Sequence, residues 1–390
     1  MANKHEAYEL AQMQSLSLES KIRMTKQRIE AWYESWKCYE IFNKKTEKTR
    51  FVTATEEPPL KEDEYIETIT TGQVYVSFSG GKDSTVLKHI VDSMYSDVPA
   101  VFVNTGLEYP EIQAFARDIK EGKYDCFNSD IEIVRPEMRF DEVIKKYGFP
   151  VVSKDVSQTV KTARGNKNTY RYKKITGTAT DKNGNKSIYN MPQWKFLLEA
   201  PFETSSQCCD VMKKRPIHKY EKETHRKPFI ATMASESLNR KTAWMKNGCN
   251  AFEAKKPKSQ PLSFWTEQDI LLYLKKYNVP YCSVYGDIVI DEKADGENIL
   301  EGQINLIDYL GCHEATDKLK TTGCSRTGCI FCMFGCHLEK EPNRFQRLKE
   351  THPKQYKYCI GGGEMIDGKW QPSKEGLGLG KVLDYIGVEY

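Results

Sequence analysis

The chain has 390 residues, of which 39% are hydrophobic and 29% are charged, as expected for a globular protein of about two domains. Its 58 Lys and Arg residues nearly balance its 54 Asp and Glu residues, and the net charge of +4 excludes a histone-like polycation or a disordered acidic chain. No stretch approaches about 18 apolar residues, and the first residues lack the apolar core of a secretory signal. We therefore expect a cytoplasmic protein without membrane contact.

The N-terminal part is predicted to be helical. Apolar residues recur at helical spacing over 13–45, which predicts one helix packed on the domain behind it, with a partner-binding helix as the alternative. The polar stretch 53–64 contains a Pro pair and is interpreted as a linker. Residues 1–64 are thus expected to form a helix and a linker.

Strands and helices alternate through the next part of the chain, 65–285. Short β-rich runs predict strands at 74–78, 98–103, 131–134 and 229–233. Helices are predicted at 85–94, from Pro110 onwards, at 140–147 and at 265–277. This alternation predicts an α/β fold, with a Rossmann-like, mostly parallel sheet and helices on both faces. Residues 286–390 are expected to form a small cysteine-rich C-terminal extension.

Residues 154–190 form a basic insertion within this region. Asp155 is the one acid in 154–174, Tyr170 and Tyr172 are interleaved, and 176–190 is rich in turn residues, as in a loop or hairpin. The segment 154–174 has seven basic residues, Lys154, Lys161, Arg164, Lys167, Arg171, Lys173 and Lys174. One interpretation is a solvated surface insertion, and the other is a nucleic-acid contact in which tyrosines stack on bases.

The sharpest local motif is Ser79-Gly80-Gly81-Lys82-Asp83-Ser84, which lies between a predicted strand and helix. Its glycines allow a tight turn and close approach of an anion, and N–H groups at the start of the helix favour phosphate. Ser79, Lys82 and Ser84 add hydroxyl groups and a positive charge, while Asp83 is expected to orient the loop or hold Mg²⁺. The spacing differs from that of a Walker A loop.

Twelve cysteines are many for a cytosolic enzyme, where disulfides are rare and clustered thiols favour metal or redox chemistry. Cys208 and Cys209 are adjacent, and five more occur close together at Cys312, Cys324, Cys329, Cys332 and Cys336. From spacing alone, the C-x-x-C pair Cys329/Cys332 is compatible with zinc, an iron–sulfur cluster or free dithiols.

The glycine loop resembles the pyrophosphate loop (PP-loop) of the adenine nucleotide α-hydrolase superfamily, whose members commonly cleave ATP between the α and β phosphates. Further segments, in the same order, resemble the phosphoadenosine phosphosulfate (PAPS) reductase family and extend the resemblance over about 70–340. They are Phe102 to Glu111, Cys208-Cys209-x-x-x-Lys213-x-x-Pro216, Glu236-Ser237-x-x-Arg240, Pro261-Leu262-x-x-Trp265 with Val279-Pro280-Tyr281, and Gly328-Cys329-x-x-Cys332.

This resemblance implies a set of site residues. ATP with Mg²⁺ would bind residues Ser79, Gly80, Gly81, Lys82, Asp83 and Ser84, and Asn104, Thr105 and Gly106 would shape the adenine–ribose pocket. Lys213 and Arg240 would supply fixed positive charge, so the expected catalytic groups are Lys82, Asp83, Lys213 and Arg240. A [4Fe–4S] cluster would be bound by Cys208, Cys209, Cys329 and Cys332. A rival ligand set uses Cys312, Cys324 or Cys336 in place of one or both of the tandem cysteines, and zinc is the alternative metal.

Two departures from the family pattern bear on function. The loop is intact, as in ATP-using members, whereas reductases usually have a degraded one. The reductases' C-terminal E-C-G-[LI]-H segment is missing, and Cys359, followed by three glycines, is the closest candidate for its cysteine.

The leading hypothesis is therefore an ATP pyrophosphatase of sulfur metabolism. It would cleave ATP to AMP and pyrophosphate to activate a substrate for iron–sulfur-dependent sulfur transfer, a combination similar to that of DNA phosphorothioation enzymes and some tRNA thiolases. Expected partners are a sulfur donor such as a cysteine desulfurase, or a reductant such as thioredoxin or ferredoxin. The alternatives are a PAPS or adenylyl sulfate reductase that makes sulfite, and a non-catalytic regulator that binds nucleotide and cluster.

Overall fold

The computed structural model describes residues 4–291 and 318–390, and the chain divides into two units, each built from several segments. The first unit contains residues 1–103, 109–134 and 219–327. The second unit contains residues 104–108, 135–218 and 328–390, so the basic insertion and the C-terminal residues belong to the same unit. Cys312, one of the rival ligands, lies outside the described residues.

A six-stranded sheet forms the centre of the first unit, with the order β6-β5-β4-β7-β9-β8. All neighbouring pairs are parallel except β8 and β9, which confirms the predicted mostly parallel sheet. The strands are β4 (Val74–Phe78), β5 (Ala100–Val103), β6 (Ile131–Val134), β7 (Lys227–Ile230), β8 (Asn250–Ala251) and β9 (Lys258–Ser259).

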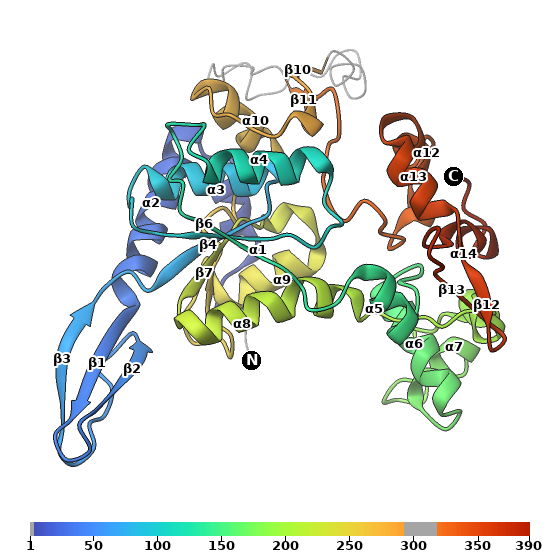
Figure 1. Cartoon of the computed structure of the whole chain (residues 1–390), viewed down its shortest axis with the longest axis horizontal. Coiled ribbons are helices and arrows are strands. Elements are labelled where there is room, and N and C mark those ends of the chain that lie inside the picture. The colour runs from blue at the N-terminus through green and yellow to red at the C-terminus, as the bar shows by residue number, and fades with distance from the viewer. Residues whose placement is uncertain (1–3, 292–317) are drawn as a thin grey trace. The chain divides into compact units, whose positions relative to one another are not determined.

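Helices cover both faces of this sheet, as predicted. Side chains alternate between the two faces of a strand, and those of β4 meet different helices. Phe78 contacts Phe115 with ring centroids 6.3 Å apart, whereas Tyr75 contacts Tyr220 at 5.0 Å. Figure 1 shows α3 and α4 on one side of these strands and α8 and α9 on the other. The helices of this unit include α3 (Lys82–Asp92), α4 (Pro110–Lys120), α8 (Arg215–Thr224), α9 (Leu238–Asn247) and α10 (Glu267–Lys276).

The N-terminal residues differ from the prediction of one helix over 13–45 followed by a linker. Helices α1 (Ala7–Gln14) and α2 (Leu18–Ser35) are followed by an antiparallel sheet of β1 (Lys37–Asn43), β2 (Lys48–Ala54) and β3 (Glu64–Thr70). The helical spacing ends because Tyr39 and Ile41 alternate as buried residues of a central strand, which forms a hairpin with β2 and also pairs with β3. Helix α2 does pack on the domain, since Ile29 and Trp32 are fully buried in its core.

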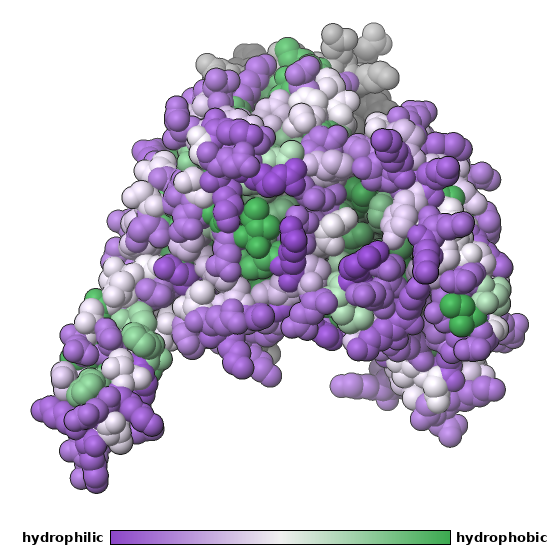
Figure 2. Space-filling view, in the orientation of Figure 1, coloured by the Kyte–Doolittle hydropathy of each residue, from purple (hydrophilic) through white to green (hydrophobic). Residues whose placement is uncertain are grey.

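The N-terminal sheet leaves apolar side chains at its surface. Phe51 is 55% exposed and Ile69 is 52% exposed, and Figure 2 shows hydrophobic residues on this sheet. Cross-strand pairing puts Phe51 opposite Glu40 and Ile69 opposite Tyr39, so the two exposed side chains lie on opposite faces. They therefore do not form one continuous patch.

In the second unit, short helices surround a largely irregular chain. Arg164 is one of the basic residues for which a nucleic-acid contact was predicted. Its side chain donates hydrogen bonds to four carbonyl groups and so fixes the chain around 192–202; they are those of Leu197, Leu198, Ala200 and Phe202.

None of the helices among the described residues combines the length and apolar character needed to cross a membrane. The helices and strands of the second unit are α5 (Phe140–Tyr147), α6 (Lys154–Gly165), α7 (Tyr170–Thr176), α12 (Arg344–Thr351), α13 (Pro353–Ile360), β12 (Glu364–Ile366), β13 (Lys369–Gln371) and α14 (Leu379–Tyr385). The remaining strands of the first unit, β10 (Ile288–Ile290) and β11 (Leu319–Thr321), pair with each other.

A buried ion pair joins α2 to the start of α10. Both oxygen atoms of Asp269 lie 2.8 Å from Nζ of Lys21, and Asp269 also accepts hydrogen bonds from the backbone and hydroxyl groups of Thr266, the N-cap of α10. Nearby, the Trp265 indole donates to the Thr25 hydroxyl at 2.9 Å. These contacts anchor the helix that begins with Glu267, a residue of the site described below.

We expect Lys21→Met to destabilise the protein by about 3–5 kcal/mol, because it leaves the carboxylate of Asp269 buried without its partner. The measurement is urea unfolding followed by circular dichroism. The control is Lys4→Met, which removes one partner of the exposed Lys4–Glu253 pair and is expected to cost less than about 1 kcal/mol. Similar losses for both variants would contradict the assignment of Lys21 as an anchor.

Candidate nucleotide and cysteine sites

The glycine loop connects β4 to α3 with a conformation that depends on glycine. Gly80 has φ +72°, and a Cβ atom there would lie 2.7 Å from Cγ2 of Ile112. The Ser84 hydroxyl accepts a hydrogen bond from the Ser79 N–H at 3.2 Å and donates to the Gly81 carbonyl at 2.8 Å. The loop is therefore held in shape by its own side chains before any ligand binds.

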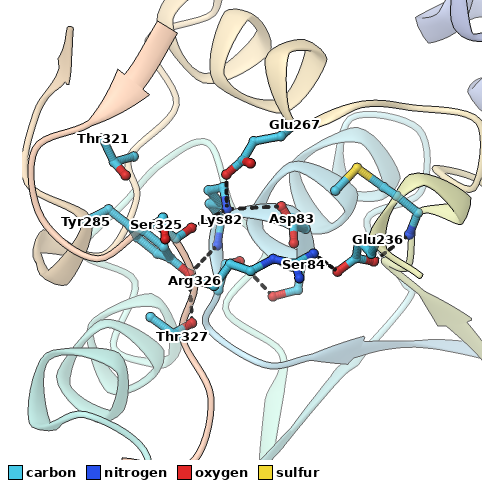
Figure 3. Close-up of polar contacts among 12 residues, drawn as sticks. Lys82, Asp83, Ser84, Glu236, Glu267, Tyr285, Thr321, Ser325, Arg326 and Thr327 are labelled. Carbon is cyan, nitrogen blue, oxygen red and sulfur yellow. Dashed lines mark hydrogen bonds and ion pairs between the residues drawn. The ribbon is translucent and has the colours of Figure 1, made fainter. Parts of the chain in front are cut away.

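Lys82 is 3% exposed, and its ammonium group is surrounded by oxygen atoms of the chain. It donates to the Ser325 carbonyl at 2.7 Å and lies 3.1 Å from the carboxylate of Glu267 (Figure 3). Its backbone N–H donates to the Tyr285 hydroxyl at 3.1 Å, and that hydroxyl is 2.7 Å from Oγ1 of Thr327. Protein oxygens thus occupy the two groups of Lys82 that would bind a phosphate.

The carboxyl group of Asp83 is buried beside Lys82. Burial raises its pKa, although the positive charge of Lys82 opposes this effect. Its Oδ1 atom is 3.9 Å from Nζ of Lys82 and has no hydrogen-bond partner among the described residues. A buried carboxylate oxygen without a partner is suited to a divalent cation, so Asp83 fits the predicted Mg²⁺ site of a bound nucleotide.

Two arginines lie close to this loop. Arg240 forms an ion pair with Glu236, and Arg326 contacts the same carboxylate at 2.7 Å (Figure 3). Burial lowers the pKa of Arg240, the charge of Arg326 lowers it further, and Asp83 opposes the change. The predicted residue Arg240 therefore belongs to the loop's electrostatic environment.

Sequence reasoning missed Glu267, Tyr285, Arg326 and Thr327 as members of this site. Three of them stand next to features that the sequence does mark: Arg326 and Thr327 directly precede the Gly328-Cys329 motif, and Glu267 directly follows the N-cap Thr266. Nothing in the local pattern marks Tyr285, which approaches the loop only through tertiary packing.

The predicted adenine–ribose residues form a tight turn that belongs to the second unit. The carboxylate of Glu108 accepts hydrogen bonds from the Thr105 N–H at 2.9 Å and hydroxyl at 2.8 Å, and the Asn104 side chain accepts from the Gly106 N–H at 3.1 Å. Gly106 has φ +74°, which favours glycine. The turn is thus rigid, and its assignment to adenine and ribose stays a prediction.

The second unit brings the four predicted cluster ligands together. Cys208, Cys209, Cys329 and Cys332 line one pocket, although the two pairs are separated by about 120 residues. Its other walls are mainly apolar and are formed by Leu107, Phe140, Pro150, Met212, Lys213 and Phe331. Burial raises the pKa of Cys329 to about 11, and Lys213 partly opposes this effect.

The tandem cysteines differ in acidity. Their mutual hydrogen bond lowers the pKa of Cys209 to about 6, against the effect of burial and with help from Lys154 and Lys213, and raises that of Cys208. Burial disfavours the charged form of Lys213, but Cys329 and Glu108 outweigh it and raise the pKa of Lys213. The structure therefore places Lys213 among the cysteines, where its charge stabilises thiolates.

Of the rival ligands that the structure describes, Cys324 and Cys336 are not among the residues that line this pocket. Cys336 is buried and its thiol donates to the Met333 carbonyl at 3.0 Å, while Cys324 belongs to the first unit. Cys359 is fully buried within α13, so the candidate for the missing C-terminal cysteine is a core residue.

Within the described ranges, no three His, Cys, Asp or Glu side chains converge closely enough to hold one metal ion. A tetrahedral zinc site needs such convergence, with Zn–S bonds of about 2.3 Å. A [4Fe–4S] cluster is larger and bonds each thiolate to a different iron. Four thiols that line one mainly apolar pocket are a donor set that thiolate-binding metal centres use, and the choice between a cluster and zinc stays a prediction.

We expect Tyr285→Phe to strengthen binding of Mg·ATP about 3- to 10-fold, because a phosphate oxygen no longer has to displace the tyrosine hydroxyl from the Lys82 N–H. Isothermal titration calorimetry measures this affinity. The matched control is Tyr277→Phe, whose side chain is exposed at the end of α10. Weaker binding by Tyr285→Phe would mean that the hydroxyl contacts the nucleotide and does not compete with it.

A comparison with protein-family models agrees with the sequence motifs. The family model for the phosphoadenosine phosphosulfate reductase domain matches residues 73–188 and 156–333, which together span more than half of the chain. A similar solved structure is a phosphoadenylyl-sulfate (PAPS) reductase from Candida auris in a phosphate complex, with 15% identity, a TM-score of 0.30, and coverage of 54% of this chain and 75% of that chain. The search of curated proteins finds no match. The chain therefore belongs to the phosphoadenosine phosphosulfate reductase domain family.

Proposed function

We propose that this protein cleaves ATP to AMP and pyrophosphate and uses the cleavage to activate a substrate for sulfur transfer. Membership of the family makes it a nucleotide-binding enzyme of sulfur metabolism. The observation that carries the finer proposal is the complete glycine loop at the start of α3. It brings together Lys82, the hydroxyls of Ser79 and Ser84, and an oxygen of Asp83 that has no hydrogen-bond partner among the described residues.

The chemistry follows from where charge develops. An oxygen of the acceptor attacks the α-phosphorus of ATP, a new P–O bond forms, and the bond between the α-phosphorus and the bridging oxygen breaks to release pyrophosphate. Lys82 and the first N–H groups of α3 would stabilise the negative charge of the leaving group. Arg240 and Arg326 would add positive charge nearby, and Asp83 would hold the Mg²⁺ that neutralises the phosphates. The terminal sulfur of a persulfide, from a donor such as a cysteine desulfurase, then displaces AMP from the acceptor, and a thiol reductant cleaves the resulting S–S bond to leave the sulfur on the acceptor.

The cysteine pocket supports the sulfur part of this proposal. Cys208, Cys209, Cys329 and Cys332 would hold a [4Fe–4S] cluster, which when bound supplies electron transfer or a site for sulfur. Lys213 would keep the surrounding thiolates charged, because its ammonium group interacts with both Cys329 and Cys209.

A second candidate is reduction of adenylyl sulfate or PAPS to sulfite. The observation that favours it is Lys213 beside the cysteine pocket, together with the family match. The state of Cys359, the closest candidate for the reductases' C-terminal cysteine, speaks against it, since this thiol is fully buried and burial raises its pKa well above the ordinary value. A thiol in that state is a poor nucleophile.

One assay distinguishes the two reactions. We expect anaerobically purified protein, given its sulfur acceptor or a cell extract that contains it, to release pyrophosphate from ATP and no sulfite from adenylyl sulfate or PAPS with a thiol reductant. Lys82→Ala should slow pyrophosphate release about 100-fold or more, since a preorganised cation at the transition state is lost. The control is Lys120→Ala, an exposed lysine at the end of α4. Sulfite production without ATP cleavage would establish the reductase instead, and turnover of neither compound despite binding would indicate a regulator.

We expect Cys329→Ser and Cys208→Ser each to lose most of the bound iron and acid-labile sulfide, because each removes a thiolate from the pocket. Iron and sulfide analysis with visible absorption spectroscopy provides the measurement. Cys126→Ser, in which an exposed cysteine of the first unit is replaced, is the control and should keep full iron content. Loss in Cys336→Ser with retention in Cys208→Ser would establish the rival ligand set, and stoichiometric zinc in a colourless protein would overturn the cluster.

A further inference from the structure

A hollow on the surface of the second unit combines lysines with two aromatic rings. We call it the cationic hollow and define it by Lys145, Lys146, Tyr147, Lys161, Lys369 and Trp370, all of which line one pocket. These residues come from the end of α5, from α6 and from β13, so the hollow is built from three parts of the chain. It involves none of the residues assigned to the nucleotide loop or to the cysteine pocket.

The hollow carries an excess of positive charge. Its lining contains four lysines and one carboxylate, that of Glu203, which leaves a net charge of three positive units. Glu203 is already paired with Lys369 at 2.7 Å and Arg164 at 3.6 Å, and the hydrogen bond from Lys369 lowers its pKa. Over the described ranges, no carboxylate forms an ion pair with Lys145, Lys146 or Lys161. Three ammonium groups are thus available to an anionic partner.

The helix dipole by itself explains why some of these lysines are present at the hollow. Lys145 and Lys146 lie in the last turn of α5, where cations complement the helix dipole. Lys161 lies in the interior of α6 and Lys369 lies on a strand, so the dipole does not explain their presence. The convergence of all four on one hollow needs another reason.

The two aromatic rings are held in place by surrounding contacts. The Tyr147 ring has Nζ of Lys146 and Nζ of Lys161 each 5.5 Å from its centroid. The Trp370 indole donates to the Gly378 carbonyl at 2.8 Å, and the ring packs so closely on Gly363 that a Cβ atom there would lie 2.3 Å from it. Both rings remain partly exposed. A ring that is already fixed loses little conformational entropy when a planar ligand stacks on it.

The structure also narrows the predicted nucleic-acid contact at 154–174. Arg164 is committed to backbone carbonyl groups, and Arg171 and Lys174 both pair with Asp155. Lys161 is the residue of that segment that lines the cationic hollow. The other lysines of the hollow, Lys145, Lys146 and Lys369, lie outside the segment.

We propose that the cationic hollow binds single-stranded nucleic acid, with phosphates on the lysines and bases stacked on Tyr147 and Trp370. Long, exposed lysine side chains suit a phosphodiester backbone, and aromatic rings beside them suit unpaired bases. A duplex hides its base faces in its own stack. An acidic peptide would use the lysines but has no planar groups for the two rings. The proposal concerns binding alone and does not depend on the proposed ATP chemistry.

The test is fluorescence anisotropy of the full chain with 20-nucleotide single-stranded DNA and RNA of mixed sequence, without ATP. Contacts to three or four phosphates predict that log K falls with log salt concentration with a slope of about −2 to −3. Lys145→Ala/Lys146→Ala/Lys161→Ala should reduce that slope by about 2 and weaken binding at least about 10-fold. Tyr147→Leu should weaken binding about 5- to 100-fold through lost stacking, and Tyr147→Phe should restore most of it.

The matched control removes three exposed lysines of the N-terminal sheet region, Lys45→Ala/Lys48→Ala/Lys61→Ala, and should leave binding within about 2-fold. Thermal unfolding verifies that every variant is folded. Binding of the single strand that depends on both Tyr147 and the lysines supports the proposal. Absence of binding at 50 mM salt, equal affinity for duplex DNA, or equal competition by polyphosphate, which has charge but no bases, would each overturn it.

Discussion

A buried ammonium group needs hydrogen-bond acceptors close to it. In the first unit, the buried ammonium group of Lys82 requires the chain to bring oxygen atoms to it. With 3% of its surface exposed, the charge cannot be solvated by water and is instead met by the Ser325 carbonyl and the Glu267 carboxylate. These oxygens come from the start of α10 and from the segment after β11. One charge therefore holds together the glycine loop, a helix and a stretch of chain that is remote in sequence.

The oxygen atoms that surround Lys82 also affect how the glycine loop could bind a ligand. The Tyr285 hydroxyl accepts from the Lys82 N–H, and the Ser325 carbonyl accepts from its ammonium group, so each stands where a phosphate oxygen would be favourable. The buried Oδ1 atom of Asp83, by contrast, accepts no hydrogen bond among the described residues and lies 3.9 Å from Nζ of Lys82. Binding of Mg²⁺ and a phosphate would satisfy both groups at once. In the second unit, Lys213 has the corresponding role, since it offsets the cost of burying thiolates in an apolar pocket.

The agreement between sequence and structure depends on how local each signal is. The strands at 74–78 and 131–134 and the helix at 140–147 are found where predicted, because their apolar periodicity reports burial directly. The predicted helix over 13–45 is wrong beyond residue 35, since aromatic residues at helical spacing also fit a strand once β2 and β3 pair with it. Arg164 lies in a basic segment whose composition is typical of a nucleic-acid contact, yet its guanidinium group donates to carbonyl groups more than 30 residues away.

By itself, the amino-acid sequence determined the α/β class and the position of the glycine loop, which follow from periodicity and from a motif whose chemistry and spacing are local. The four cysteines that line one pocket were implied by the resemblance to a family, since spacing alone left other ligand sets open. Only the tertiary structure decided that Tyr285, Arg326 and Glu267 surround the loop, that Lys213 lies among the thiols, and that Lys145, Lys161 and Lys369 share one hollow. Such groupings depend on contacts between side chains that are far apart in the sequence. No local sequence pattern specifies which of these side chains meet to neutralise a buried charge or to form a surface.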